Sequence, residues 1–332
     1  MKKILNDPFA YATETLRGLV RAYPQYYRLV PGQARVIGRA GGAVPGKVGI
    51  VTGGGSGHLP VFTGYIGPGL LDACASGDVF ASPTAEEMAE AIRAANGGAG
   101  VLRLYGNYGG DVMNYDMAGD LVALDDIEVT TVLVADDVAS APIAERDKRR
   151  GVAGMVFAFK IAGAAAAAGK ALNEVTAIAQ RAADAMRSMG VALGPCTVPA
   201  VGHPTFTIGD DEMEIGMGIH GEPGVHRGKL QPASFIADQL LDPILADLSP
   251  VKGDRVAVLV NSLGATPVEE LFILYDRIAS RCEQAGVIIA SSLVGRYATS
   301  MEMSGASLTL LALDPELEGL LKAPAECAFW KV

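Results

Sequence analysis

Four glycines among five residues, followed by a histidine, form the stretch of this sequence best suited to chemistry. It runs Gly53-Gly54-Gly55-Ser56-Gly57-His58 and follows the apolar residues 48–51. Without Cβ atoms a backbone can take positive φ and direct its N–H groups at an oxygen-rich ligand. The run matches neither G-x-x-x-x-G-K-[ST] nor G-x-G-x-x-G, so nucleotide binding is not indicated. We predict a strand that ends in a ligand loop, with a plain tight turn as the alternative.

His220 offers a second reactive imidazole. Apolar residues at 213, 215, 217 and 219 alternate with polar or small ones, which predicts a half-buried strand. This strand is predicted to form a hairpin with residues 206–208, across a turn at 209–211. On such a strand His220 faces away from the apolar row, so a functional role is favoured over a structural one.

The elements that position these residues follow an α/β rhythm. Strands are predicted at 35–38, 48–51, 100–105 and 129–134, with helices from Pro8, from Ser82 and over 170–189. This alternation is typical of a parallel sheet with both faces covered. Ligands bind beyond the carboxyl ends of such strands, where the glycine segments 53–57 and 106–111 fall.

After residue 190 the sequence becomes rich in glycine and proline. A helix at 267–285 and strands at 287–290 and 307–313 follow. We therefore predict an α/β fold with two domains. A larger, mostly parallel three-layer domain at 1–189 carries the glycine loop, and a smaller two-layer domain at 190–332 carries His220.

Composition narrows the class of protein. The 332 residues are half apolar, with a mean hydropathy of +0.28 and a net charge of −10. The negative charge argues against nucleic acid and anionic membranes as partners. We expect no membrane span and no secretory signal. The four cysteines lack C-x-x-C spacing, which favours reduced thiols and a cytoplasmic location.

Asp136 and Asp137 end a predicted strand and are the one pair of carboxylates that suggests a metal. Two carboxylates without further ligands are more often solvated or paired with cations, here among residues 146–150. We expect no metal site.

Six segments together resemble one family, the dihydroxyacetone-binding subunit of dihydroxyacetone kinases. They are residues 53–58, 77–83, 107–111, 160–164, 194–199 and 218–224. The resemblance implies a two-domain α/β subunit that forms a homodimer. It implies that the residue matching His220 adds covalently to a ketone carbonyl as a hemiaminal. His58 and Asp111 would bind the reacting hydroxyl and take its proton.

The same resemblance implies the substrate-binding positions and the partner. Gly55, Ser56, Gly57 and the position of Gly106 would contact substrate, together with His58 and Asp111. No nucleotide cradle is found in this sequence, so we expect no cofactor in this chain. ATP or ADP with Mg would be held by a separate helical nucleotide-binding (DhaL-type) subunit, with a phosphotransferase-system phosphocarrier as a further possible partner. Since no helical domain follows Val332, that partner is expected to be another polypeptide.

Three positions depart from the family pattern. Leu59 stands where the family usually has Glu, Phe62 where it has His, and Gly106 where it has Lys. The loss of these polar groups predicts a reshaped pocket, and a tetrulose such as erythrulose in place of dihydroxyacetone. An alternative is a non-catalytic ketone-binding regulator. A dinucleotide enzyme lacks its fingerprint.

Overall fold

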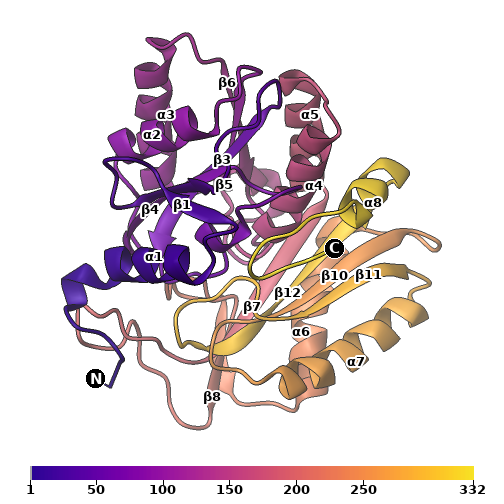
Figure 1. The fold of residues 1–332 in the computed structure, drawn as a ribbon. Coiled ribbons are helices and arrows are strands. Elements are labelled where there is room, and N and C mark those ends of the chain that lie inside the picture. Colours follow the sequence, from indigo (N-terminus) through magenta and orange to yellow (C-terminus); the bar gives the residue numbers. More distant parts are fainter. Residues whose placement is uncertain (1) are drawn as a thin grey trace. The chain divides into compact units, whose positions relative to one another are not determined.

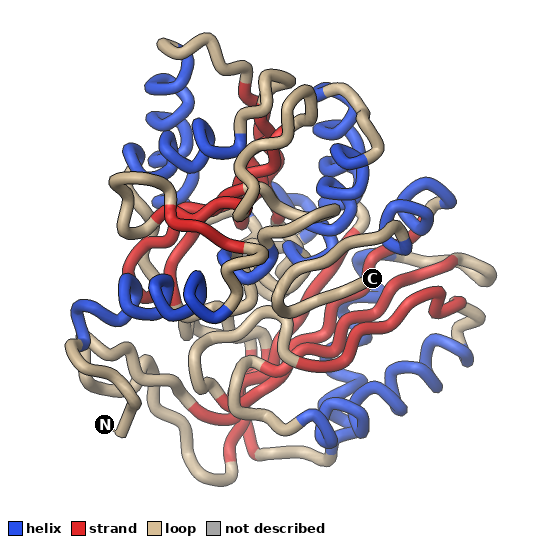
Figure 2. The backbone as a smooth tube through the Cα atoms, viewed as in Figure 1, coloured by secondary structure: helices blue, strands red, loops and turns tan. Residues whose placement is uncertain are grey.

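The computed structural model describes residues 2–332, which pack into two compact units. The first unit contains the chain up to Val134 together with Phe157–Ala182 and Gly319–Val332. The second contains Ala135–Val156 and Ala183–Glu318. Each unit is built on one six-stranded sheet. Figure 1 labels most of the elements, and Figure 2 colours the chain by helix, strand and loop.

The sheet of the first unit has the order β1-β2-β4-β3-β5-β6. Its strands are β1 (Tyr27–Leu29), β2 (Val36–Arg39), β3 (Gly49–Ser56), β4 (Ala73–Val79), β5 (Val101–Gly106) and β6 (Val129–Val134). β3 is parallel to β4 and to β5, and β5 is parallel to β6. β1 and β2 add an antiparallel edge. The predicted mostly parallel sheet is confirmed.

Helices cover both faces of this sheet. The helical segments are η1 (Pro8–Ala10), α1 (Tyr11–Ala22), η2 (Thr63–Tyr65), α2 (Ala85–Ala95), α3 (Gly109–Ala123), α4 (Met155–Ala167) and α5 (Leu172–Asp184). Val51 packs in one apolar cluster with α2 and α3, while the adjacent Ile50 points to the opposite face and is also fully buried. Thr130, which alternates with Val129 of the same cluster, hydrogen-bonds Thr176 of α5. The first unit therefore has three layers.

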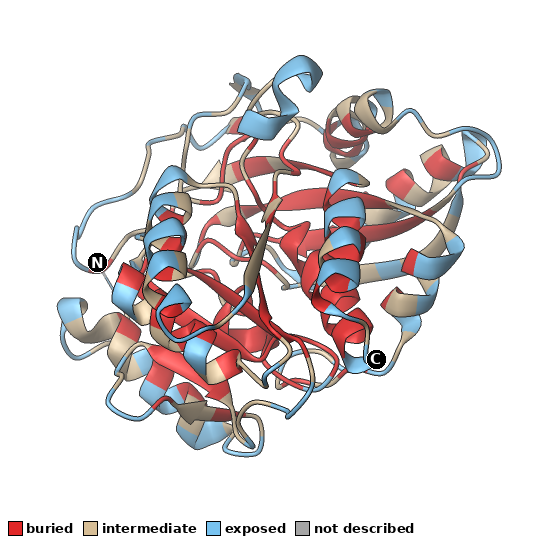
Figure 3. Cartoon of the chain, turned by 90° about the horizontal axis from the view of Figure 1, so that it is seen from above, coloured by how far each residue is buried: buried red, intermediate tan, exposed pale blue. Residues whose placement is uncertain are grey.

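The sheet of the second unit has the order β11-β10-β12-β7-β8-β9. Its strands are β7 (Met186–Gly194), β8 (Glu212–Ile215), β9 (His226–Lys229), β10 (Arg255–Ser262), β11 (Ile288–Gly295) and β12 (Ser304–Leu313). Its helical segments are η3 (Ile143–Lys148), α6 (Ala233–Leu248), α7 (Val268–Gln284) and the start of α8 (Pro315–Lys322). β10 and β11 are parallel and the other pairs antiparallel. One face packs against α6 and α7, and the sheets are largely buried in Figure 3.

Two predicted elements end differently in the structure. The helix predicted at 170–189 stops at Asp184. Met186 begins β7 instead, and it pairs with Leu311 of β12. Sheet pairing thus overrides the helical spacing of the apolar residues. No strand forms at 206–208, and β8 ends at Ile215 because Gly216 takes a φ of +82°. The hairpin partner of β8 is β9.

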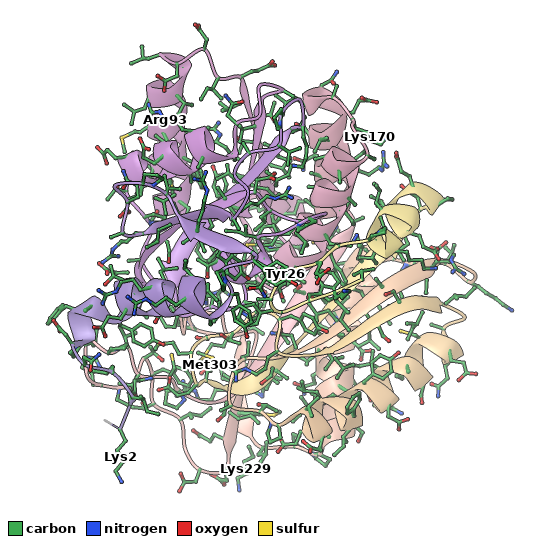
Figure 4. The ribbon with its side chains drawn as sticks, in the orientation of Figure 1. Lys2, Tyr26, Arg93, Lys170, Lys229 and Met303 are labelled. Atoms are coloured by element: carbon green, nitrogen blue, oxygen red, sulfur yellow. The ribbon has the colours of Figure 1, made fainter. Side chains whose placement is uncertain are left out.

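The compact units also differ from the predicted division at 189 and 190. β7 crosses that position as one continuous strand of the second unit. Residues 135–156 join the same unit, since Ser188 N–H donates to Asp136 O at 2.7 Å. The C-terminal residues join the first unit, where the Tyr26 hydroxyl, labelled in Figure 4, donates to Glu326 at 2.6 Å. Contacts distant in sequence decide these assignments.

Within residues 2–332, no helix combines the length and the apolar character that crossing a bilayer would require.

Candidate functional site

Gly53, Gly54 and Gly55 lie inside a strand, which corrects the prediction of a loop. All three are buried in β3 and pair in parallel with Ala75, Ser76 and Gly77 of β4. On the side of β4, the backbone of these glycines therefore takes part in strand pairing, whereas the pairing of β3 with β5 ends at Val51. The turn begins only at Gly57, whose φ of +103° is the conformation that favours glycine.

Each of these glycines leaves room for an aromatic residue or its backbone. A Cβ atom on Gly53 would lie 2.9 Å from the Tyr115 hydroxyl, and one on Gly54 would overlap the ring of Phe62. A Cβ atom on Gly55 would lie 2.7 Å from the Cα atom of Phe80. The glycines thus allow close packing against β3.

His58 is held between two of these aromatic rings. Its side chain is only 1 % exposed. It stacks on Phe80 with ring centroids 4.9 Å apart, and Phe62 meets it edge-on at 6.0 Å. Phe80 is fixed in turn, because its N–H donates to the Ser56 carbonyl at 3.0 Å. Aromatic rings therefore pack against the His58 imidazole on two sides.

Ser56 supports the end of β3. Its hydroxyl donates to the Gly77 carbonyl at 2.8 Å and lies 2.9 Å from the Ser76 hydroxyl. These contacts tie β3 to β4 at the point where the chain turns toward His58. Ser56 therefore helps to hold the turn in place.

Asp111 lies at the same edge of the sheet as His58. Gly106 ends β5, which is the parallel neighbour of β3, and α3 starts three residues later. Asp111 is in the first turn of α3 and 7 % exposed, where the helix N-terminus favours a negative charge. Burial and then the charge of Asp111 raise the pKa of the Cys74 thiol. Sequence reasoning correctly placed Asp111 beyond the carboxyl end of a strand, whereas Gly106 is the last residue of that strand.

His220 belongs to the second unit and lies in a turn, not on the predicted strand. Gly221 N–H donates to the Gly218 carbonyl at 3.1 Å, which closes the turn between β8 and β9. Nδ1 of His220 is 3.0 Å from Oε1 of Glu222, and its backbone N–H donates to Oε2 at 2.9 Å. The carboxylate therefore fixes both the ring and the backbone of His220.

Glu222 is ionised at all physiological pH values. Burial by itself raises the pKa of this carboxyl, but the hydrogen bond and charge of His220, with a smaller effect of Arg150, lower it to about 2. Arg150 Nη1 is 3.8 Å from Glu222 Oε2. Sequence reasoning assigned no role to Glu222 or to Phe80. Their location in the sequence could have indicated a role, because Phe80 and Glu222 each lie within one of the six matched segments, beside a glycine turn.

The two candidate metal ligands are used within the fold. Asp137 pairs with Arg150 at 2.7 Å, as expected for a cation among residues 146–150. Asp136 accepts hydrogen bonds from the N–H groups of Val152 and Gly154, each at 2.8 Å, and from the Ser188 hydroxyl.

These features define a two-unit α/β protein with an aromatic-packed histidine in one unit and a carboxylate-held histidine in the other. A family model, the Dak1 domain, matches residues 17–329. The chain belongs to the Dak1 domain family.

Comparison with known proteins gives three informative relatives. The chain is 47 % identical over 331 residues to the PTS-dependent dihydroxyacetone kinase 1, dihydroxyacetone-binding subunit DhaK, of Listeria innocua, covering 99 % of this chain and 100 % of that protein. It is 43 % identical to the D-erythrulose kinase of Mycolicibacterium smegmatis, covering 100 % of this chain and 57 % of that protein. Among solved structures, the dihydroxyacetone kinase operon co-activator DhaQ matches with a TM-score of 0.88 and 31 % identity, covering 94 % of this chain and 96 % of that one. The family assignment from the six segments is confirmed.

Proposed function

We propose that this protein is the ketose-binding subunit of a two-component kinase of the dihydroxyacetone type. It holds a short ketose on His220 and presents a terminal hydroxyl for phosphoryl transfer from a separate nucleotide-binding subunit. This proposal rests on one observation: the chain is similar along its whole length to a dihydroxyacetone-binding kinase subunit. The contact between His220 Nδ1 and Glu222 supports a nucleophilic histidine.

The covalent step is an addition without a leaving group. The Nε2 lone pair of His220 forms a bond to the ketone carbon, and the carbonyl π electrons move to its oxygen, which takes up a proton. The net proton comes from the imidazole, so the adduct has the combined mass of protein and ketose. Such attack selects ketones over polyols of similar shape, which hydrogen bonds alone distinguish poorly.

His58 and Asp111 then act on the hydroxyl that receives phosphate. Both hydrogen-bond this hydroxyl, and its proton is accepted as the bond to phosphorus forms. We assign contacts with the ketose to the positions of Gly55, Ser56, Gly57 and Gly106, as the family resemblance implies. ATP or ADP with Mg belongs to the helical partner subunit, and a phosphotransferase-system phosphocarrier is the other source of phosphate. The subunit acts in the cytoplasm as a homodimer.

We further propose that the ketose is a tetrulose such as erythrulose. Gly106 has no side chain at a position where the family resemblance implies Lys, which leaves room for a longer substrate. Phe62 is buried against Gly54 and His58, and Leu59 is half-buried, so apolar atoms replace polar ones near His58. The similarity to an erythrulose kinase supports this substrate class.

A ketone-binding regulator is the second candidate, because the DhaQ co-activator shares the fold. A regulator needs only the covalent histidine. This chain also has His58 and Asp111 at one edge of the sheet, which favours the kinase.

The adduct is tested directly on the purified chain. After incubation with erythrulose or dihydroxyacetone, intact-protein mass spectrometry should show an increase equal to the full mass of the ketose. His220→Ala should show no increase and should lose ketose binding. Equal ketose affinity of wild type and His220→Ala would exclude the covalent mechanism.

Kinase activity is tested with the cognate nucleotide-binding subunit. The chain alone should not turn over ATP, and the pair should phosphorylate erythrulose with kcat/KM about 10- to 200-fold above that for dihydroxyacetone. Asp111→Asn should lower kcat by on the order of 10² or more while the adduct still forms. A preference for dihydroxyacetone would contradict the proposed substrate, and ATP turnover by the single chain would contradict the partner requirement.

A further inference from the structure

A chain of alternating charges lies beside His220 in the second unit. Asp137 accepts two contacts from Arg150, from Nε at 3.0 Å and from Nη2 at 2.7 Å. Nη1 of the same guanidinium is 3.8 Å from Glu222, whose other oxygen meets His220 Nδ1 at 3.0 Å. The order is thus carboxylate, guanidinium, carboxylate, imidazole.

The turn that carries His220 is shaped around this charge chain. A Cβ atom on Gly218 would overlap the Glu222 carboxylate and would lie 2.5 Å from Arg150 Nη1. Arg150 Nη2 also donates to the Gly216 carbonyl at 3.2 Å. The guanidinium therefore contacts the backbone before the turn and the carboxylate after it.

Arg150 itself is fixed from several sides. Its N–H donates to the Ser140 hydroxyl at 3.0 Å, and its carbonyl accepts from Asp137 N–H at 3.1 Å. The preceding residue, Arg149, is 2 % exposed and forms a two-point ion pair with Asp247 of α6. A guanidinium anchored in this way keeps a positive charge at a fixed position, 3.8 Å from the Glu222 carboxylate.

We propose that Arg150 and Asp137 are positioning residues for His220. They hold the Glu222 carboxylate against Nδ1, so that Nδ1 carries the proton and Nε2 carries the lone pair that attacks the ketone. The inference deepens the proposed function, since it assumes that His220 is the nucleophile. As the N–C bond forms, the ring becomes cationic, and Glu222 stabilises that charge while the new alkoxide oxygen is protonated.

The charge states agree with this role. Burial raises the pKa of Asp137 to about 6 even though Arg150 lowers it, so Asp137 is mostly ionised at neutral pH. Asp137 in turn balances Arg150, which would otherwise be a cation with one weak contact to Glu222.

The first test measures the tautomer of His220 without any ketose. The protein carries ¹⁵N-labelled histidine, and the signals of His220 are assigned by their loss in His220→Ala. Spectra are recorded at about pH 8.5, above the ordinary titration range of histidine side chains. Wild type should show protonated Nδ1 and unprotonated Nε2. Glu222→Ala should shift His220 toward the Nε2–H form that an unassisted histidine favours.

The second test separates Arg150 from a general effect of lost charge. Replacing Arg150 alone would leave Asp137 as a buried unpaired carboxylate, so the double variant Arg150→Gln/Asp137→Asn removes both charges together. Arg146→Met is the matched control, because Arg146 is an exposed cation in the same segment. Thermal unfolding confirms that each variant folds.

The double variant should show a mixed His220 tautomer and an adduct equilibrium constant about 3- to 10-fold lower than wild type. Glu222→Ala should lower it by about 10- to 100-fold, as expected for a lost charge-assisted hydrogen bond. Arg150→Lys, which keeps the charge but loses the planar fork, should lie between wild type and the double variant. The control should match wild type.

A folded double variant with the wild-type tautomer and adduct constant would overturn the positioning role. So would an Nε2–H tautomer in the wild-type protein. If instead the tautomers respond as expected but His220→Ala still binds ketose normally, the proposed nucleophile is wrong while the charge chain stands.

Discussion

Two of the four histidines of this protein, His58 and His220, have different surroundings. His58 is buried, and its ring packs against the rings of Phe80 and Phe62. His220 is partly exposed and its ring follows the Glu222 carboxylate. Aromatic contact fixes where a ring lies, whereas a carboxylate also selects which nitrogen carries the proton. A nucleophile needs the second kind of control.

Glu222 should make the stability of the protein depend on acid pH. Its pKa in the folded chain is about 2, against an ordinary value of 4.5. Between these values the unfolded chain binds more protons, so the free energy of unfolding rises with pH from about 2 to 4.5. At pH 7 wild type should exceed Glu222→Gln by on the order of 1–3 kcal/mol, and the difference should shrink as the pH falls toward 2.

Urea unfolding of both proteins at a series of pH values measures this difference. Glu283→Gln, an exposed change on α7, serves as control and should show little effect. A gap between wild type and Glu222→Gln that stays constant from pH 2 to pH 7 would contradict the expected linkage.

At the scale of elements, the glycine-rich strand β3 is the feature that most affects the site. Its buried glycines bring the Tyr115 hydroxyl, the Phe62 ring and the Phe80 backbone close to the sheet. Protein interiors are close-packed, so a single added methyl group here must displace a neighbour. The glycines of β3 therefore determine how closely these aromatic residues approach the sheet, and the aromatic rings beside His58 are among them.

Gly54→Ala should destabilise the protein by about 1–3 kcal/mol, the usual cost of overpacking a core. The new Cβ atom would overlap the buried ring of Phe62, which would have to move away from His58. Gly41→Ala is the control, because a Cβ atom there would meet nothing within 4 Å. Chemical denaturation measures both. Unchanged stability in Gly54→Ala would mean that the ring of Phe62 can shift at no cost.

At the scale of the whole molecule, long-range ion pairs decide which parts of the chain belong together. Asp247 of α6 binds Arg149 and also Arg187 of β7. These three residues are about 90 % or more buried and lie far apart in the sequence. They fasten residues 135–156 to the second unit, and so fix the segment that contains Arg150.

Asp247→Ala should destabilise the chain by about 3–5 kcal/mol, because it leaves two buried guanidinium groups without their carboxylate. Asp238, on the same helix, also binds two arginines, Arg277 and Arg281, but its side chain is 24 % exposed. Asp238→Ala should therefore cost no more than about 1 kcal/mol. Equal costs in urea unfolding would show that burial does not set the strength of these pairs.

Local sequence patterns determined much of this protein. Alternating apolar strands and helix-start signals predicted the α/β class and placed Asp111 beyond the carboxyl end of β5. Six motifs identified the family, which the match over residues 17–329 confirms. These features depend on residue type and short spacing, and such information is complete in the sequence itself.

Only the tertiary structure decided how several of the same residues are used. Glycines that are compatible with a loop form a strand because they pair with β4, and Met186 belongs to β7 because it pairs with Leu311 of β12. His220 lies in a turn, and Glu222 and Arg150 meet there from segments more than 70 residues apart. The reason is that packing, strand pairing and charge pairing are contacts between distant segments. A local pattern permits several such contacts, and the fold as a whole selects one.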